Sequence, residues 1–312
     1  MRRVSFSFFL IFLVFTFFSC HGKSEGRSKS GKIHVLATIF PAYDWAKNLA
    51  AGCDSVEVEL LLKDGVDLHS YQPSAKDIVK ISTADIFIYV GGESDAWVQK
   101  ALENAKNESM TVINLMEILR NLVKKEEFVE GMTDFDSHDE PGFDEHIWLS
   151  LSNAIAVANE ISGALIEKDE ANAQIYTANL VSYMQALSSL KESYSGSFGE
   201  KTIIVCDRFP FRYLADEFGI KYYAAFSGCS AETEASFETI AFLSEKAREL
   251  SASSVFVTES SDKKIARTVI SESKNGEIPI ITLDSMQSTT LRQAEKGADY
   301  LDIMRANLEA LK

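Results

Sequence analysis

The sequence predicts an α/β protein of two lobes with mostly parallel sheets, joined by one long backbone helix. Strand-like apolar runs alternate with helical periodicity from residue 32 to about 115, and this alternation resumes after residue 200. Such alternation is typical of a parallel sheet with helices on both faces. In between, residues 169–195 repeat apolar side chains at helical spacing without a glycine or proline. Such a helix extends about 40 Å, so we expect lobes at 33–168 and 198–312 and a linking helix at 169–197.

In the first lobe, four apolar runs predict the strands. They read IHVLATI, VEVELLL, IFIYV and TVINL in chain order. The helices between them are expected at AYDWAKNLAA, from Ser74 to Thr83, and from Trp97 to Ala105. Ser74 and Asp77 form a capping-box pair, which predicts that the second of these helices begins just after Pro73.

The second lobe follows the same alternation. Its expected strands read TIIVC, KYYAAF, SSVFVTE and IPIITLD. The expected helices read FRYLADEF, SFETIAFLSEKAREL and KKIARTVISES, followed by a closing helix from Glu295 to Leu311. The two lobes share this βα rhythm, but no internal sequence repeat accompanies it.

The N-terminus has the form of an export signal. Arg2 and Arg3 precede an apolar stretch that is too short to span a bilayer comfortably, and Cys20 follows it directly. This segment resembles a bacterial lipoprotein signal, so we expect residues 1–19 to be removed, Cys20 to be lipidated, and residues 20–32 to form a flexible tether. The protein would then face the periplasm or the cell exterior. A plain secretory signal cleaved nearby is the alternative.

Charge and cysteine content restrict the possible partners. The formal net charge is −15, which argues against nucleic acid or an anionic lipid surface as a partner and is compatible with a cation. Three cysteines remain beyond the anchor: Cys53, Cys206 and Cys229. Cys206 and Cys229 could pair outside the cytoplasm, which the sequence leaves open. No CxxC pair is present, which argues against a thiolate zinc site.

Two histidines and two carboxylates follow strands or lie at a lobe boundary. His69 is in the polar loop DGVDLHSYQPSAKD, and His146 precedes the middle helices. Asp207 follows TIIVC and Glu259 follows SSVFVT. Ligands bind at such loop edges of open α/β sheets, and this donor set suits a divalent transition metal. Alternatively, His69 is solvated, His146 packs beside a tryptophan, and the carboxylates cap helices.

Several segments resemble the substrate-binding proteins of bacterial ABC importers for zinc and manganese. They read ATIFPAYDWAKNLAAG, DGVDLHSYQPSAKD, ADIFIYVGGESDAWVQKAL and DEHIWLSLSNA, and the likeness covers essentially the whole mature chain. The resemblance implies two α/β lobes joined by one long helix, with His69, His146 and Glu259 as ligands. It also implies a monomeric zinc receptor, or alternatively a manganese or iron receptor, that serves a permease and its ATPase.

The third ligand of that family is where this chain departs. The family places a histidine or glutamate three residues before an aromatic residue that corresponds to Phe211, and Arg208 stands there. Because arginine stays protonated, it cannot bind a metal. We expect the neighbouring Asp207 to substitute, with Glu232, Glu234 or a water molecule as alternatives. His138, in an acidic stretch before the second motif, is either a weak form of the family's metal-binding loop or simply solvated.

Other functional classes predict different features. A metal-dependent hydrolase needs an open coordination position and a general base, and no HExxH or similar motif is present. We therefore expect a binding protein and not an enzyme. An adhesin would need only the acidic lobes and the anchor. A siderophore or cobalamin receptor would share the architecture but would not require both histidines.

Overall fold

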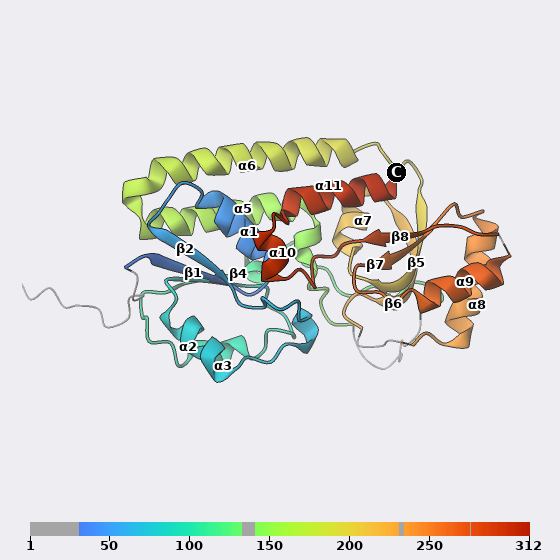
Figure 1. Ribbon diagram of the computed structural model, residues 1–312, viewed down its shortest axis with the longest axis horizontal. Coiled ribbons are helices and arrows are strands. Elements are labelled where there is room, and N and C mark those ends of the chain that lie inside the picture. The colour runs from blue at the N-terminus through green and yellow to red at the C-terminus, as the bar shows by residue number, and fades with distance from the viewer. Residues whose placement is uncertain (1–30, 133–140, 231–233, 275) are drawn as a thin grey trace, which may run out of the picture.

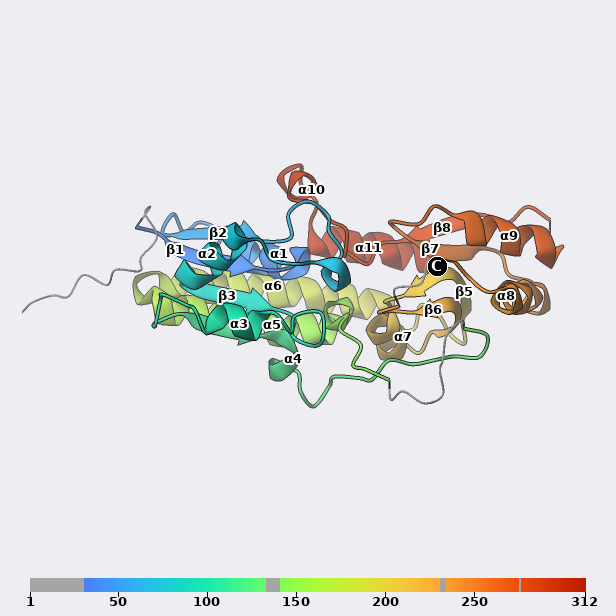
Figure 2. The same cartoon turned by 90° about the horizontal axis from the view of Figure 1, so that it is seen from below.

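The computed structural model describes residues 31–132, 141–230, 234–274 and 276–312. Two sheets lie side by side along the long axis of the molecule, and long helices run along one side of them (Figures 1 and 2). The predicted signal segment, Cys20, His138 and Glu232 lie outside the described residues. No helix within the described ranges is long and apolar enough to cross a membrane.

The first lobe contains a four-stranded parallel sheet in the order β2-β1-β3-β4. The strands are β1 (Ile33–Ala37), β2 (Val56–Leu60), β3 (Ile86–Tyr89) and β4 (Thr111–Asn114). The helices that accompany them are α1 (Phe40–Leu49), α2 (Ala75–Thr83), α3 (Val98–Leu102) and α4 (Leu115–Ile118). The capping box between Ser74 and Asp77 is present at the start of α2.

The second lobe has the same topology, because its strand order β6-β5-β7-β8 again places the first strand between the second and the third. Its elements are β5 (Thr202–Phe209), α7 (Arg212–Phe218), β6 (Lys221–Ser227), α8 (Phe237–Glu249), β7 (Val255–Thr258), α9 (Lys264–Ser273) and β8 (Ile280–Leu283). The pairing of β5 with β6 shifts between Val205 and Arg208. Such irregularities reorient side chains, and this one falls at Cys206 and Asp207.

The linking region is a layer of helices (Figure 1). Helix α5 (Leu151–Lys168) is followed by a short 3-10 turn (Glu170–Asn172) and by α6 (Ala173–Tyr194), so the long helix begins later than the predicted residue 169. The predicted closing helix is two helices, α10 (Leu291–Glu295) and α11 (Tyr300–Leu311). Gly297, between them, has a φ of 101°, which a helix does not accept. Helix α11 then packs against α6.

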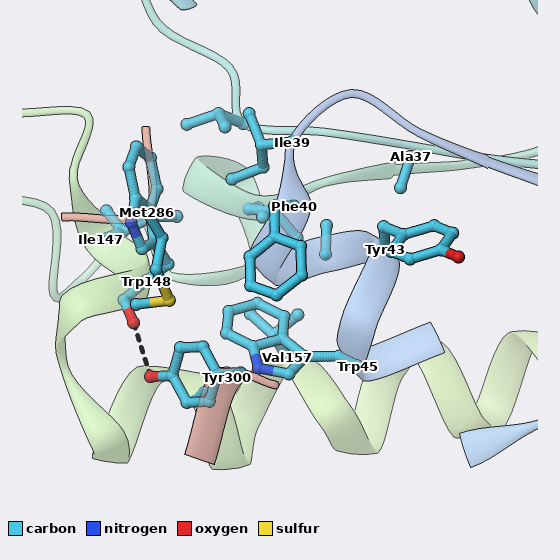
Figure 3. Close-up of a cluster of buried hydrophobic side chains, with 14 of the residues drawn as sticks. Ala37, Ile39, Phe40, Tyr43, Trp45, Ile147, Trp148, Val157, Met286 and Tyr300 are labelled. Carbon is cyan, nitrogen blue, oxygen red and sulfur yellow. Dashed lines mark hydrogen bonds between the residues drawn. The ribbon is translucent and has the colours of Figure 1, made fainter. Parts of the chain in front are cut away.

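A shared core joins the two lobes (Figure 3). It brings together side chains of α1, the segment that follows His146, and the C-terminal part of the second lobe. Trp148 is fully buried; its Nε1 donates to Ser285 O at 2.9 Å, and its carbonyl accepts from Tyr300 Oη at 2.7 Å. The ring of Tyr300 meets the edge of Trp45 at a centroid distance of 5.2 Å. Burying each such aromatic side chain contributes on the order of 2 kcal/mol. His146, two residues before Trp148, is thus held at the junction.

Candidate metal centre

His69 is held at the carboxyl edge of the first sheet. It lies in the 3-10 turn Leu68–Ser70, where its amide donates to Asp67 Oδ1 at 3.0 Å. Its Nδ1 is hydrogen-bonded to Ser94 Oγ at 2.7 Å. The side chain is 13% exposed. Because one ring nitrogen is bonded to the protein, Nε2 is left as the nitrogen that faces the lobe junction.

The support for His69 continues into a buried carboxylate that the sequence interpretation missed. Glu145 Oε1 accepts from the Ser94 amide at 2.9 Å, and its other oxygen lies 3.7 Å from His69 Nδ1. Gly92, at a φ of +85°, lies so close to this carboxylate that a Cβ would collide with it. Burial raises the pKa of Glu145. The position of Glu145, immediately before the histidine of the second motif, was the available signal.

His146 is fully buried at the other side of the junction. Both its backbone amide (2.9 Å) and its Nδ1 (2.8 Å) contact Asp144 Oδ1. The edge of its ring meets Trp148 at a centroid distance of 5.3 Å. A carboxylate on Nδ1 fixes the tautomer and the ring orientation and makes Nε2 the available lone pair, as is typical of histidine ligands.

The two histidines face each other. Their Nε2 atoms are 3.3 Å apart. Two nitrogens that each lie about 2.0–2.1 Å from a tetrahedral metal are themselves separated by about 3.3 Å, so this spacing suits two ligands of one ion. Gln287 Nε2 lies 2.7 Å from His146 Nε2, which places an amide donor where the ion would bind.

The electrostatics allow at most one charged ring in the pair. Burial, assisted by the neighbouring His146, lowers the pKa of His69 to about 4. Burial also opposes a charge on His146, but the neighbouring carboxylates, with Asp144 the strongest, outweigh it and raise the pKa of His146. A proton on the pair therefore favours His146, and a metal ion must displace it.

Cys229 joins the two histidines, although the sequence interpretation did not include it as a ligand. Its sulfur and the nitrogens of His69 and His146 all lie within 4.8 Å of one another. A second, overlapping group contains Glu126, Asp144, His146 and Cys229. Burial raises the pKa of the Cys229 thiol well above its usual range, and the negative charges of Glu126 and Asp144 raise it further. Cys53, Cys206 and Cys229 are all free, so the disulfide that the sequence left open is not formed.

Asp207 has other partners. Its Oδ1 accepts from the Arg208 amide at 2.8 Å, and its Oδ2 accepts from Thr258 Oγ1 at 2.9 Å. Asp207, Arg208 and His69 line a cleft of about 430 Å³ between the lobes. Among the described residues, Asp207 is not in either group of potential metal ligands. Metal coordination by Asp207 therefore stays a prediction.

Glu259 also faces a loop and not the imidazole pair. One of its oxygens accepts from the Ser285 amide at 2.9 Å and the other from Ser285 Oγ at 2.8 Å, and Ser288 Oγ lies 3.2 Å away. This loop carries Gln287, which contacts His146. Within the described ranges, Glu259 is absent from the groups of potential ligands. In this arrangement Glu259 supports the loop behind the site.

The remaining candidates lie elsewhere. Glu234 is exposed. Arg208, which occupies the register of the family's third ligand, pairs with Asp67 Oδ2 at 2.9 Å. It therefore links the second lobe to the loop that holds His69.

Comparison with known proteins shows which family this chain belongs to. The zinc-binding lipoprotein AdcA of Streptococcus pneumoniae is 30% identical over 93% of this chain, which spans 57% of the length of that relative. The high-affinity zinc uptake system protein ZnuA of Bacillus subtilis is 28% identical over 93% of this chain and 90% of its own. The crystal structure of the Zn(II)-bound ZnuA-like domain of S. pneumoniae AdcA matches with a TM-score of 0.69 and 27% identity, over 90% of this chain and 98% of that one. Residues 35–312 match the ZnuA family model, described as the periplasmic component A of the zinc-uptake complex, and the chain therefore belongs to this family.

Proposed function

We propose that this protein is an extracytoplasmic receptor that binds Zn²⁺ between its lobes and delivers it to the permease of an ABC importer. The observation that carries the proposal is the pair of Nε2 atoms, 3.3 Å apart, on His69 and His146. Membership of a zinc-uptake family supports zinc as the cargo. Manganese is the alternative cargo for the same site.

Two features of the site suit capture and release. Each ring is oriented through Nδ1, by Ser94 on His69 and by Asp144 on His146, so little conformational freedom is lost when the metal binds. Gln287 Nε2 lies 2.7 Å from His146 Nε2, so its amide occupies the position at that nitrogen that the ion would take. The ion would exchange with this amide, and a small movement of the Gln287 loop would accompany binding and release.

The proposal includes finer statements about assembly. We propose that Cys20 carries a lipid, that the lobes act as a monomer, and that a permease with its ATPase receives the metal. The hydrophobic segment before Cys20 supports the anchor. Replacing Cys20 with serine should release the protein from membranes while leaving its zinc affinity unchanged, because twelve residues of sequence separate Cys20 from the start of β1 at Ile33. If the variant still sediments with membranes after a high-salt wash, the lipid anchor is excluded.

The main test is to replace both histidines. His69→Ala combined with His146→Ala should reduce zinc affinity by at least a thousandfold, about 4 kcal/mol, measured by competition with a chelator. His34→Ala is the matched control, because His34 lies in β1 and contacts Glu59 at 3.1 Å. Near-native zinc affinity in the double variant would refute the site. A receptor also binds its metal stoichiometrically without hydrolysing ester or peptide substrates.

A further inference from the structure

The loop after β6 brings a sulfur atom to the imidazole pair. Cys229 lies two residues beyond the end of β6, in the second lobe, whereas both histidines belong to the first. The sulfur and the two ring nitrogens lie within 4.8 Å of one another. Three potential ligands from two lobes thus converge on one point.

The backbone of this loop is packed against the histidine. At Gly228, an added Cβ would lie 3.1 Å from His146 Nδ1 and 3.0 Å from the Phe209 carbonyl oxygen, so a larger residue would require the ring or the loop to shift by a few tenths of an ångström. The Cys229 amide donates to Glu126 Oε1 at 3.0 Å. The glycine and this hydrogen bond together hold the cysteine beside the ring.

Arg208 and the two predicted carboxylate ligands of the second lobe are engaged elsewhere. Arg208 pairs with Asp67, Asp207 accepts from Thr258, and Glu259 holds the loop of Ser285 and Ser288. Of the second-lobe side chains that the structure describes, Cys229 is the one grouped with both histidines.

We propose that Cys229 is the third protein ligand of the metal and replaces the histidine or glutamate that Arg208 has displaced from that role. This inference rests on the proposed function as a metal receptor. Binding would exchange the S–H bond of Cys229 for a metal–sulfur bond and release one proton to water. No CxxC pair is needed, because the two histidines supply the remaining nitrogen donors.

A thiolate would also set the preference of the site. Sulfur is a soft donor that suits zinc, whereas manganese favours carboxylate, carbonyl and water oxygens. A site with two imidazoles and one thiolate should therefore discriminate against manganese more strongly than one with two imidazoles and two carboxylates.

The first experiment uses the unmodified protein, so it does not depend on how a variant folds. Zinc-loaded and metal-free full-length chains are treated with an alkylating reagent, and modification is mapped residue by residue by mass spectrometry. Zinc should slow alkylation of Cys229 at least tenfold in the metal-bound form. Cys53, which is outside the group of ligands, is the internal control. Equal alkylation rates of Cys229 with and without bound zinc would overturn the proposal.

The second experiment uses Co²⁺ as a spectroscopic probe. The wild-type protein and Cys53→Ser should show a thiolate-to-cobalt charge-transfer band in the near ultraviolet, and Cys229→Ser should lack it. Cys229→Ser should also bind Zn²⁺ at least tenfold more weakly, with a smaller loss for Mn²⁺. Circular dichroism of the metal-free variant checks that it is folded.

These outcomes separate the two proposals. Tight, stoichiometric Co²⁺ binding without the charge-transfer band would reject Cys229 as a ligand and leave the receptor function intact. If the wild-type protein bound neither Zn²⁺ nor Co²⁺, the receptor function itself would fail.

Discussion

In the first lobe, each imidazole is oriented through Nδ1 and turns Nε2 toward the junction, where the amide of Gln287 contacts His146. In the second lobe, the oxygens of both predicted carboxylates are hydrogen-bonded within that lobe. His69 and His146 are oriented by Ser94 and Asp144. Asp207 and Glu259 accept from donors of their own lobe. Residues that looked equivalent in the sequence therefore differ in what they can offer to an ion. A histidine can bind the ion through Nε2, and the hydrogen-bond partner of its Nδ1 fixes where Nε2 points.

Among the residues that only support the proposed ligands, the largest loss of zinc affinity is expected where the support of a histidine is disturbed. Asp144→Asn should weaken zinc binding about 10- to 100-fold, because the amide lacks the charge that holds Nδ1 protonated and increases the basicity of Nε2. Asp44→Asn is the matched control, since Asp44 is a buried aspartate in α1 that contacts Tyr300. Chelator competition measures both affinities. Equal affinities in these two variants would show that Asp144 does not tune the metal ligand.

A smaller effect is expected from the second-lobe carboxylates. Asp207→Asn and Glu259→Gln should each change zinc affinity less than tenfold, because both side chains bond to Thr258 or Ser285 and contact neither imidazole in the described structure. Isothermal titration calorimetry provides the measurement. A loss of tenfold or more in Asp207→Asn would favour direct coordination by Asp207 and imply that the second lobe rearranges when metal binds.

The smallest change in zinc affinity is expected from a substitution in the shared core. There, the free energy of unfolding should change instead. Burial, together with the negative charge of nearby Asp299, raises the pKa of Asp44 to about 7. Because this pKa is raised, the stability that the neutral carboxyl supports is present at low pH and is lost as pH rises through about 7. At about 1.4 kcal/mol per unit of pKa shift, Asp44→Asn should stabilise the metal-free protein by about 2–4 kcal/mol at pH 8. Asparagine can still accept the hydrogen bond from the Tyr300 amide.

Urea unfolding at pH 5 and pH 8 checks this prediction. The stability difference between Asp44→Asn and the wild type should be larger at pH 8, while zinc affinity at pH 8 stays within about twofold. A difference independent of pH would mean that Asp44 is not held neutral by burial.

Local pattern alone was sufficient for much of the architecture. The apolar runs of β1 and β5, the capping pair before α2, and the helical repeat of α6 are determined within a few residues, since they depend on backbone propensity and side-chain periodicity. The loops of His69 and His146 were predicted in the same way. The sequence also contained Gly297, but the split between α10 and α11 was missed because a single glycine inside a helical pattern is often tolerated.

The sequence by itself determined the two lobes, the helix that links them and the two histidine motifs, because each of these is written in short-range periodicity or in a contiguous motif. Only the tertiary structure decided that the two Nε2 atoms are 3.3 Å apart, that Cys229 joins them and that Asp207 turns toward Thr258. These relations join residues 51 to 160 positions apart in the chain. Their distances depend on how Trp148, Tyr300 and the facing loops pack, and packing across two lobes leaves no local pattern in the sequence.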